Sequence, residues 1–589
     1  MPTTPPTRHG SDRVAEALQA QGVRCVFTLC GGHISPILSA SKARGIRIVD
    51  VRDEATAVFA ADATARLSGL PGVAAVTAGP GITNTITALK NAQLAQSPVI
   101  LIGGAAPTAL QGRGALQDID QRPLVAPHVK LFKKIRRVRE LGPAVDEAFE
   151  VALMGVPGPV FIECPVDLLY DEASIRQWYA DAAGKGTAVA DRLLRFYLNR
   201  HVKKMFDGSH DFVTPQLRPV VPPRARDASL QGALAALAKA ERPLLVIGSQ
   251  ALALAAEAHR LADAVAKLGI PVYLSGMARG LLGRDHPLQM RHQRRQALRD
   301  ADCVLLAGVP CDFRLDYGKH VRRSATLIAA NRSTRDARLN RKPDIAAIGD
   351  AGLFLQALAQ GQPASSSTSV TGSRLAGWLA TLRGRDAERA LEIDQQAQAS
   401  GEFVNPIALF RALEQSAGDN ALLVADGGDF VATASYVLQP RAPLTWLDPG
   451  AFGTLGVGAG FALGAALACP ESEVWIIFGD GACGYGLVEF DTFVRHGIPV
   501  IALVGNDAGW TQIAREQVKM LHDDVATVLA RTDYHAVAAG FGAEGILVKT
   551  MAEVPAALAR ARALVKSGKP VLVNVWLDKT EFREGSLSM

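Results

Sequence analysis

The sequence has few cysteines and few aromatic residues, and its N-terminus has no secretion signal. Seven cysteines without regular spacing in 589 residues argue against a disulfide framework. Cys25 and Cys30 do not have the spacing of a metal finger. The first residues, MPTTPPTR, contain no apolar segment of the kind that signal peptides carry. We therefore expect a protein of a reducing compartment, the cytoplasm.

Charge is absent from one long stretch. Residues 451–470 contain no Asp, Glu, Lys or Arg, and about twenty such residues can span a bilayer. Most of them are glycine or alanine, which favour close backbone packing. We interpret the stretch as a buried loop and helix and expect no membrane span, while its length leaves a span open as the alternative.

The net charge of +6 is concentrated in one segment. Residues 191–226 contain eight Lys or Arg and three Asp. Without a recognisable module or interleaved aromatics, this segment does not predict a nucleic-acid partner. It predicts an amphipathic helix that packs on the body of the protein, contacts an acidic cofactor or lies on a membrane surface. The apolar face of that helix would comprise Leu193, Leu194, Tyr197, Leu198, Val202, Met205 and Phe206.

The alternation of apolar strands and helical stretches predicts an α/β protein with three doubly wound parallel sheets. Predicted strands of the first block are 23–28, 46–51, 73–77, 99–102 and 160–163, and those of the second are 244–248, 271–274, 303–307 and 327–330. The predicted parts are a first block (11–180), a basic, proline-rich connector (181–228), a central block (229–361), a linker with a helix (362–404), a third block (405–577) and a tail (578–589).

Acidic residues follow two predicted strands of the third block. The apolar run 474–479 leads into Asp480, and the run 500–505 leads into Asn506 and Asp507. Open α/β sheets bind ligands at the carboxyl ends of their strands. Mg²⁺ prefers a few carboxylates together with phosphate oxygens. The pattern therefore predicts a site for magnesium and a diphosphate, and its alternative is a Gly-Asp-Gly surface turn of an unrelated nucleotide-binding unit.

The spacing from Asp480 to Asp507 resembles the signature of thiamine-diphosphate enzymes. That signature ends in a pair of polar residues, usually Asn-Asn, and here the pair is Asn506-Asp507. An aspartate in the second position can still bind Mg²⁺. The resemblance implies that Asp480, Asp507 and Gly509 hold the metal. It implies cofactor contacts from Gly428, Asp429, Phe430, Gly453, Leu455, Gly481 and Ala482, of which Gly453 offers a carbonyl to the pyrimidine and Leu455 enforces the bent shape of the cofactor.

The first block resembles the pyrimidine-binding domain of the same family. Glu54 follows the second predicted strand, where the family has a glutamate that hydrogen-bonds the pyrimidine and assists proton removal from the cofactor. As an isolated residue, Glu54 would instead be a charge at a helix N-terminus. Gly79 and Asn84 match the cofactor-binding loop. His33 and Gln117 fall on active-site loops, where His33 serves either catalysis or a structural hydrogen bond.

The string from Gly505 to Gln512 is the most distinctive. It is similar to the acetolactate synthase-like group that includes the second type of 2-hydroxyacyl-CoA lyases. The resemblance implies a carbon–carbon lyase that splits 2-hydroxyacyl-CoA reversibly into formyl-CoA and an aldehyde or ketone. An acetolactate synthase or another 2-oxoacid carboligase or decarboxylase is the alternative. Gln512 and Glu516 match acyl-pocket positions, and Glu516 would serve either proton transfer or a salt bridge to Arg515 or Lys519.

The central block leaves its ligand open. Enzymes of the group bind either flavin or an adenine nucleotide there, and we expect ADP or the CoA nucleotide rather than FAD. The tail, with Phe582 and Arg583, is a candidate lid over CoA. The family builds its active sites from two subunits, which implies a homodimer or homotetramer. Candidate nucleotide contacts are Gly248, Ser249, Gln250, Arg279, Arg314, Asn331 and Arg332.

Overall fold

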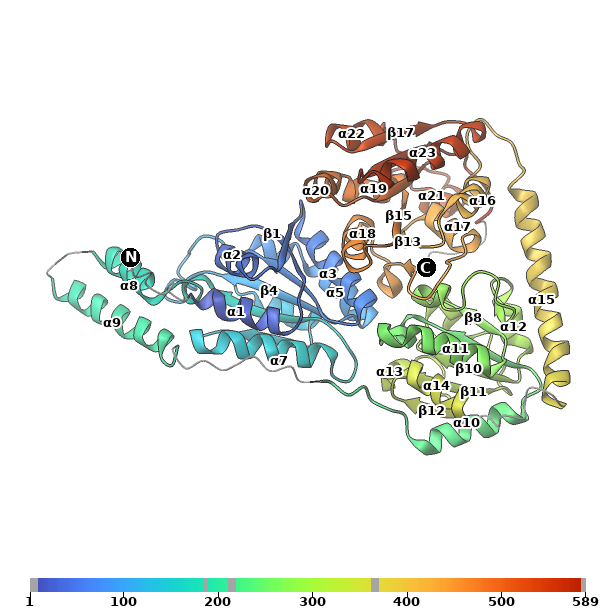
Figure 1. Cartoon of the computed structure of the whole chain (residues 1–589), viewed down its shortest axis with the longest axis horizontal. Helices are drawn as coiled ribbons and strands as arrows, with labels where there is room; N and C mark the ends of the chain where they lie inside the picture. Colours follow the sequence, from blue (N-terminus) through green and yellow to red (C-terminus); the bar gives the residue numbers. More distant parts are fainter. Residues whose placement is uncertain (1–8, 185, 187, 210–218, 362–369, 584–589) are drawn as a thin grey trace. The chain divides into compact units, whose positions relative to one another are not determined.

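The computed structural model describes residues 9–184, 186, 188–209, 219–361 and 370–583 (Figure 1). The chain divides into two compact units. The first comprises residues 1–65 and 70–221, and the second comprises 66–69 and 222–589. Residues 362–369, which form most of the flexible part of the predicted linker, lie outside the described residues. So do the last six residues of the tail, 584–589.

The first unit is built on a six-stranded parallel sheet with the order β2-β1-β3-β4-β6-β5. Every residue of β3 and β4 is buried, as expected of parallel strands covered on both faces. Its strands are β1 (Cys25–Leu29), β2 (Arg47–Asp50), β3 (Gly72–Val76), β4 (Val99–Ala105), β5 (Leu131–Lys134) and β6 (Val160–Pro165). Its helices are α1 (Gly10–Ala20), α2 (Ser35–Ala43), α3 (Glu54–Ser68), α4 (Pro80–Thr83), α5 (Ile86–Ala95), α6 (Arg122–Val125), α7 (Leu141–Leu153), α8 (Glu172–Ala183) and α9 (Val189–Phe206).

Helix α9 forms in the basic segment and lies beside α8 (Figure 1). Only part of its predicted apolar face is buried. Met205 and Phe206 pack into the core of the first unit, whereas Leu193 and Tyr197 are 63% and 51% exposed. Of the predicted face, only Val202, Met205 and Phe206, near the C-terminal end of α9, are buried. Only the last turns of α9 contact the body.

The second unit contains two more six-stranded parallel sheets, with the orders β12-β11-β10-β7-β8-β9 and β14-β13-β15-β16-β18-β17. Together, the three sheets confirm the predicted fold class. The central strands are β7 (Pro243–Ile247), β8 (Val272–Leu274), β9 (Gln289–Met290), β10 (Cys303–Ala307), β11 (Thr326–Asn331) and β12 (Ile345–Ile348). The third set is β13 (Ala421–Ala425), β14 (Trp446–Leu447), β15 (Glu473–Gly479), β16 (Ile501–Asn506), β17 (Glu544–Val548) and β18 (Val571–Trp576).

The helices of the second unit include one of 27 residues, α15. Its Trp378 and Leu382 join the core beside the central sheet, and its Ile393 joins the core beside the third sheet. The helices are α10 (Asp227–Lys239), α11 (Ala258–Leu268), α12 (Arg294–Asp300), α13 (Thr334–Ala337), α14 (Ala351–Gly361), α15 (Val370–Gln396), α16 (Pro406–Ser416), α17 (Asp429–Val437), α18 (Val457–Ala468), α19 (Asp480–Gly486), α20 (Phe490–His496), α21 (Thr511–Leu521), α22 (Tyr534–Gly540) and α23 (Val554–Lys566).

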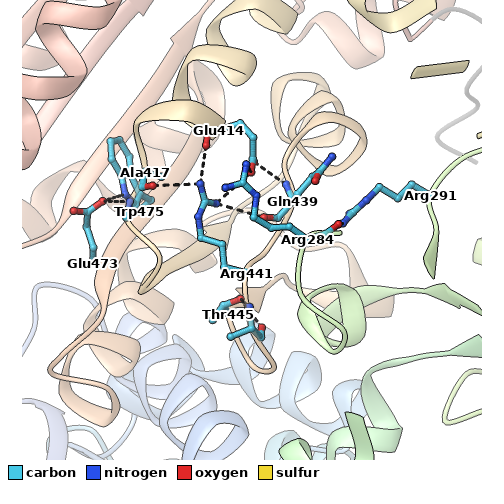
Figure 2. Close-up of polar contacts among 11 residues, drawn as sticks. Arg284, Arg291, Glu414, Ala417, Gln439, Arg441, Thr445, Glu473 and Trp475 are labelled. Atoms are coloured by element: carbon cyan, nitrogen blue, oxygen red, sulfur yellow. Dashed lines mark hydrogen bonds and ion pairs between the residues drawn. The ribbon is translucent and has the colours of Figure 1, made fainter. Parts of the chain in front are cut away.

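A partly buried ionic network links the central and third parts of the second unit (Figure 2). Glu414 of α16 lies 3.0 Å from the guanidinium of Arg284 and 3.4 Å from that of Arg441. Arg441 also donates to the main-chain carbonyl of Glu414 at 2.7 Å. A buried charge is tolerated when it is paired and hydrogen-bonded in this way.

The uncharged stretch 451–470 forms a short loop followed by α18, whose residues are mostly buried. In the described part of the chain, no helix is both long and apolar enough to cross a membrane.

Candidate active site

Two carboxylates meet at the carboxyl edge of the third sheet. Asp480 follows β15 and Asp507 follows β16, and these neighbouring strands pair in parallel register. Both residues line a cavity of about 650 Å³, which we call the main cavity. Burial, together with the nearby charge of Asp507, raises the pKa of Asp480 to about 7. Burial also raises the pKa of Asp507. Lys579 and Arg531 lie near enough to oppose this shift at Asp507, and a hard cation such as Mg²⁺ would offset the remaining repulsion between the two carboxylates.

The main chain fixes the orientation of Asp480. One carboxylate oxygen accepts the amide N–H of Gly481 at 2.8 Å, and the other accepts the amide N–H of Gly509 at 3.1 Å. Gly509 therefore contacts the predicted metal ligand through its amide. Among the described residues no group of three or more His, Cys, Asp or Glu side chains is arranged to hold a metal. The donor set is thus two carboxylates, which suits a cation that also takes phosphate oxygens.

Asn506 and Asp507 have different surroundings although they are adjacent. The Asn506 side chain is fully buried. It donates to the carbonyl of Thr532 at 3.2 Å and to the Asn574 side chain at 3.3 Å. Asp507 lines the main cavity. The second residue of the pair is therefore the one that faces the ligand site, and the first holds the loop.

A glycine turn after β13 provides a backbone surface in the same cavity. Gly428 has a φ of +100°, and no atom lies within 4 Å of the place where a Cβ would be. This conformation favours glycine and leaves the backbone open to a close ligand. Asp426 lies just before the turn, is 1% exposed and accepts the amides of Gly456 and Gly458 at 2.9 and 2.6 Å. It ties the turn to the N-terminus of α18.

Asp429 and Phe430, the next two predicted cofactor contacts, use their side chains for contacts within the protein. Asp429 forms an ion pair with Arg515 at 2.8 Å. The ring of Phe430 stacks on Phe410 at 4.5 Å and belongs to the core beside the third sheet. Only the backbone of Phe430 is therefore suited to contact a diphosphate. Because Arg515 binds Asp429, the structure assigns that arginine a partner other than Glu516.

Other predicted cofactor contacts also line the main cavity. They include Gly453, which has a φ of +64°, and Leu455, Gly481 and Ala482. A Cβ on Gly427 would lie 2.4 Å from Leu455 Cδ2, so that leucine packs directly over the glycine turn. A Cβ on Gly481 would lie 2.5 Å from the Trp510 ring. Glycine at 481 therefore lets Trp510 close the loop that carries Asp507.

The two acyl-pocket candidates on α21 have different positions. Gln512 lines the main cavity, next to Ile513. Glu516, one turn further along α21, is absent from the lining of this cavity and is partly exposed. Gln512 can therefore contact a ligand in the main cavity, whereas Glu516 is not part of the wall of this cavity.

Glu54 begins α3 in the first unit and is 7% exposed. One of its carboxylate oxygens accepts the Asn84 side-chain amide at 3.0 Å. A Cβ on Gly81 would lie 3.6 Å from the other oxygen. Glu54 and Asn84 were both predicted as site residues, and the fold brings them into direct contact. The buried carboxylate is held on one side and keeps an oxygen for a further partner.

His33, Gln117 and Gly79 form a second group in the first unit. His33 Nδ1 lies 3.2 Å from the hydroxyl of Thr77, and that hydroxyl donates to Gln117 at 3.4 Å. Burial lowers the pKa of His33, so its imidazole is neutral at pH 7. A Cβ on Gly79, whose φ is +62°, would lie 2.8 Å from the carbonyl oxygen of Gln117. Glycine at 79 thus allows the close approach of the 117 loop.

The nucleotide candidates of the central sheet fall into two groups. Asn331 donates to Gln250 at 2.6 Å, and the buried Arg332 pairs with Asp350 at 2.8 Å. These residues are used in internal contacts. Arg279 and Arg314 instead line the main cavity, as do Gly276 and Ser275.

Thr77, Asp426 and Trp510 are site-forming residues that the sequence did not single out. Thr77 joins His33 to Gln117, and Trp510 packs on Gly481. Each stands inside a motif that the sequence does display, since Thr77 precedes Gly79 and Trp510 follows Gly509. Their motif positions were a usable signal, but their contacts depend on chain segments far apart in the sequence.

Comparisons with known proteins give consistent matches along the chain. Residues 8–124 match the N-terminal thiamine pyrophosphate-binding domain of thiamine pyrophosphate enzymes. Residues 230–358 match the central domain of these enzymes and residues 426–575 match their C-terminal thiamine pyrophosphate-binding domain. The chain is 50% identical to 2-hydroxyacyl-CoA lyase 2 of Bos taurus, with 100% of this chain and 93% of the relative aligned.

Two further relatives differ in identity. The chain is 49% identical to 2-hydroxyacyl-CoA lyase 2 of Caenorhabditis elegans, over 99% of this chain and 91% of the relative. It is 35% identical to the acetolactate synthase large subunit IlvG of Mycobacterium tuberculosis, over 97% of this chain and 96% of the relative. The similarity is thus greater to the proteins named as lyases than to this synthase.

Proposed function

The chain belongs to the thiamine pyrophosphate enzymes, and on that premise we propose that it is a carbon–carbon lyase of 2-hydroxyacyl-CoA thioesters. The reaction would give formyl-CoA and an aldehyde or ketone, and it would run in both directions. The observation that carries the proposal is the pair of carboxylates, the buried Asp480 and the partly buried Asp507, that face one cavity beside an open glycine turn. The relatives named 2-hydroxyacyl-CoA lyase 2 support the choice of substrate.

The residues of the second unit would hold the cofactor through Mg²⁺ and the diphosphate. Asp480 and Asp507 would bind the metal as hard oxygen ligands. The Gly428 turn, with its open backbone, suits phosphate oxygens. Leu455, which packs on Gly427, would bound the cofactor on one side. When bound, thiamine diphosphate supplies the nucleophilic carbon and the electron sink for carbon–carbon cleavage.

Glu54 and His33 would provide the proton chemistry of the first unit. Glu54 is buried and carboxylate-bearing, as is required of a group that hydrogen-bonds an aminopyrimidine and shares a proton with it. A neutral His33 donates a hydrogen bond from one ring nitrogen and accepts one at the other, which suits a substrate hydroxyl or carbonyl. Gln117 would help to position the same oxygen. Gln512 would contact the acyl part of the substrate from the main cavity. Glu516 would take part in proton transfer only if the substrate extended past the wall of this cavity.

We further propose a homodimer or homotetramer, with active sites that combine Glu54 of one subunit with Asp480 and Asp507 of another. The support for this proposal is the family's way of building its sites. Light scattering combined with activity measurement tests it, and a fully active monomer would overturn it.

Product analysis tests the proposed reaction. The protein with Mg²⁺ and thiamine diphosphate receives formyl-CoA and an aldehyde in one tube and pyruvate alone in another. We expect a 2-hydroxyacyl-CoA in the first tube. Acetolactate in the second tube with no product in the first would overturn the lyase proposal and favour the synthase alternative. The reason to test this alternative is the 35% identity to an acetolactate synthase subunit.

A further inference from the structure

One loop of the first unit carries Gln117, the residue that would position the substrate oxygen in the proposed function. The loop leaves the sheet after β4, ends at α6 and comprises residues 106–121; we call it the Gln117 loop. Gln117 has a φ of +63°, a left-handed backbone conformation that is strained in a residue other than glycine. Such strain persists only where surrounding contacts impose it. The contacts that hold this loop therefore decide where Gln117 lies.

Two side chains hold the ends of the Gln117 loop. At the second end, the buried Gln121 donates from Nε2 to the main-chain carbonyl of Gly104 at 3.0 Å. At the first end, Thr108 donates to Asp167 and lies within hydrogen-bond distance of His201. Asp167 follows β6, and His201 belongs to α9. The first end of the loop thus depends on two segments that are distant from it in the sequence.

In the middle of the loop, the hydrogen bonds are local or long. The amide of Gly112 donates to Asp118 at 2.5 Å, a contact that stays within the loop. The Gln117 side chain accepts the hydroxyl of Thr77 at 3.4 Å, which is beyond the usual length of such a bond. The ends of the loop therefore contribute much of the order on which Gln117 depends.

A carboxylate fixes both the backbone and the side chain of Thr108. Asp167 is 2% exposed. One of its oxygens accepts the amide of Thr108 at 2.8 Å and the hydroxyl of Thr108 at 2.5 Å. The same oxygen accepts the hydroxyl of Tyr179 at 2.6 Å. Because three donors converge on this oxygen, it acts as an acceptor only.

Helix α9 completes this anchor through His201. The hydroxyl of Thr108 has one proton, and Asp167 accepts it. The Nε2 of His201 lies 2.7 Å from the same hydroxyl, so this nitrogen must carry a proton and donate it. Burial outweighs the nearby charge of Asp167 and lowers the pKa of His201. A neutral ring with its proton on Nε2 fits both observations, and the donors run from His201 through Thr108 to Asp167.

Contacts within the pair of helices α8 and α9 (Figure 1) keep His201 in this orientation. Tyr197, one turn earlier in α9, lies nearly parallel to the His201 ring at 6.1 Å, and Tyr179 of α8 meets it edge to face at 6.3 Å. Met205, one turn later, belongs to the core of the first unit. Its sulfur lies 3.4 Å from the Thr108 hydroxyl. The last turns of α9 therefore press directly on the first end of the loop.

We propose that Thr108, Asp167 and His201 are positioning residues for the reaction, because they hold the Gln117 loop in the conformation that presents Gln117 to the substrate. The inference rests on the proposed function, in which Gln117 positions a substrate oxygen. The three residues act through Gln117 and do not touch the substrate. The basic segment thereby gains a role, since its helix supports an active-site loop.

Hydrogen–deuterium exchange of the full-length protein tests the anchor without any reaction. Thr108→Val removes the hydroxyl and keeps almost the same volume. Loss of a hydrogen bond to a carboxylate corresponds to a factor of about ten or more in the equilibrium for loop opening, and amide exchange follows the population of the open state. We therefore expect the amides of residues 109–120 to exchange about tenfold faster in Thr108→Val. Thr108→Ser, which retains the hydroxyl, should exchange at the wild-type rate. Unchanged exchange in Thr108→Val would overturn the inference.

Thr28→Val is the matched control. Thr28 is fully buried in β1 of the same unit, and its hydroxyl donates to the carbonyl of Ala75 at 2.6 Å. Its replacement also removes one buried hydroxyl bond, but it should leave both the exchange of the Gln117 loop and kcat/KM unchanged. Equally fast loop exchange in this control would show that the loop reports general destabilisation, and it would overturn the inference.

Variants of His201 test the contribution of α9 and replace Thr108→Val if that variant does not fold. His201→Phe keeps a flat ring but has no donor. His201→Gln keeps a side-chain amide that can donate. We expect faster exchange of the Gln117 loop in His201→Phe and a return toward the wild-type rate in His201→Gln. Wild-type exchange in His201→Phe would overturn the assignment of α9 to the anchor.

A double-mutant cycle connects the anchor to the reaction. With formyl-CoA and an aldehyde as substrates, Thr108→Val should lower kcat/KM about tenfold. The affinity for thiamine diphosphate, whose proposed metal and diphosphate contacts lie in the second unit, should not change. Because Thr108 acts through Gln117, its replacement should cause little further loss in a Gln117→Ala background. Losses that multiply independently would overturn the positioning role. If the wild type forms no lyase product, the proposed reaction fails, and the exchange measurements still decide whether this network holds the loop.

Discussion

Replacement of Glu54 by Gln should separate catalysis from folding. The side chain is 7% exposed and accepts one hydrogen bond, from Asn84 at 3.0 Å. Glutamine keeps an acceptor oxygen and almost the same volume. The folded state therefore loses only the difference between a charged and a neutral acceptor, about 1 kcal/mol. Asn84 remains paired, so no buried group is left unsatisfied.

The catalytic effect of the same change should be much larger. A positioned acid or base contributes about 10²–10⁴ in rate, which corresponds to roughly 3–5 kcal/mol of activation free energy. We expect kcat for formation of 2-hydroxyacyl-CoA to fall by this factor, while the free energy of unfolding changes by about 1 kcal/mol. The assay measures initial rates at saturating Mg²⁺ and thiamine diphosphate, and calorimetry measures cofactor binding.

Glu147→Gln is the matched control. Glu147 lies in the same unit, pairs with Lys133 at 2.7 Å and has a side chain that is 43% exposed. Its replacement should leave kcat unchanged and cost less than about 1 kcal/mol in stability. If Glu54→Gln keeps the wild-type kcat with the cofactor bound, the proton-transfer role of Glu54 is wrong. Loss of cofactor binding instead would reassign Glu54 to binding.

Three further predictions concern the second unit. Asp507→Asn should retain Mg²⁺-dependent binding of thiamine diphosphate, because an amide oxygen still binds the metal. Asp507→Ala should lose this binding, as measured by calorimetry. Binding of wild-type strength by the alanine variant would contradict the metal assignment. Gly481→Ala should lower the free energy of unfolding by about 1–3 kcal/mol, because its methyl group would lie 2.5 Å from the Trp510 ring. The control Gly484→Ala should leave the free energy of unfolding unchanged, because its methyl group would meet no atom within 4 Å. Equal urea midpoints of the two variants would refute the packing argument. Burial raises the pKa of Asp426 to about 7, so the folded state binds a proton that the unfolded state releases near pH 4. This contribution to stability is present below about pH 4 and is lost as the pH rises to about 7. Asp426→Asn should flatten that fall in denaturation curves, and an unchanged slope would show that Asp426 is ionised throughout.

The sequence was sufficient to predict the architecture, because parallel strands that are buried on both faces have continuous apolar runs in the sequence. The predicted strand at 303–307 coincides with β10, and the predicted 99–102 lies within β4. The edge strand β2 was predicted, whereas the edge strands β5, β9 and β12 escaped prediction. The burial of β5 and β12 is incomplete, and β9 has two residues, so their sequences lack the apolar run. The position of α9 also escaped, since helical periodicity does not say which turns find a partner.

The sequence alone also determined the two acids of the proposed metal site. Asp480 and Asp507 follow consecutive apolar runs, and parallel strands put their carboxyl ends at one edge. Only the tertiary structure decided which polar side chains are available there. It buries Asn506 against Asn574 and pairs Asp429 with Arg515. It also gathers arginines from five separate segments around one cavity. Such choices depend on contacts between distant parts of the chain, and local residue patterns do not encode them.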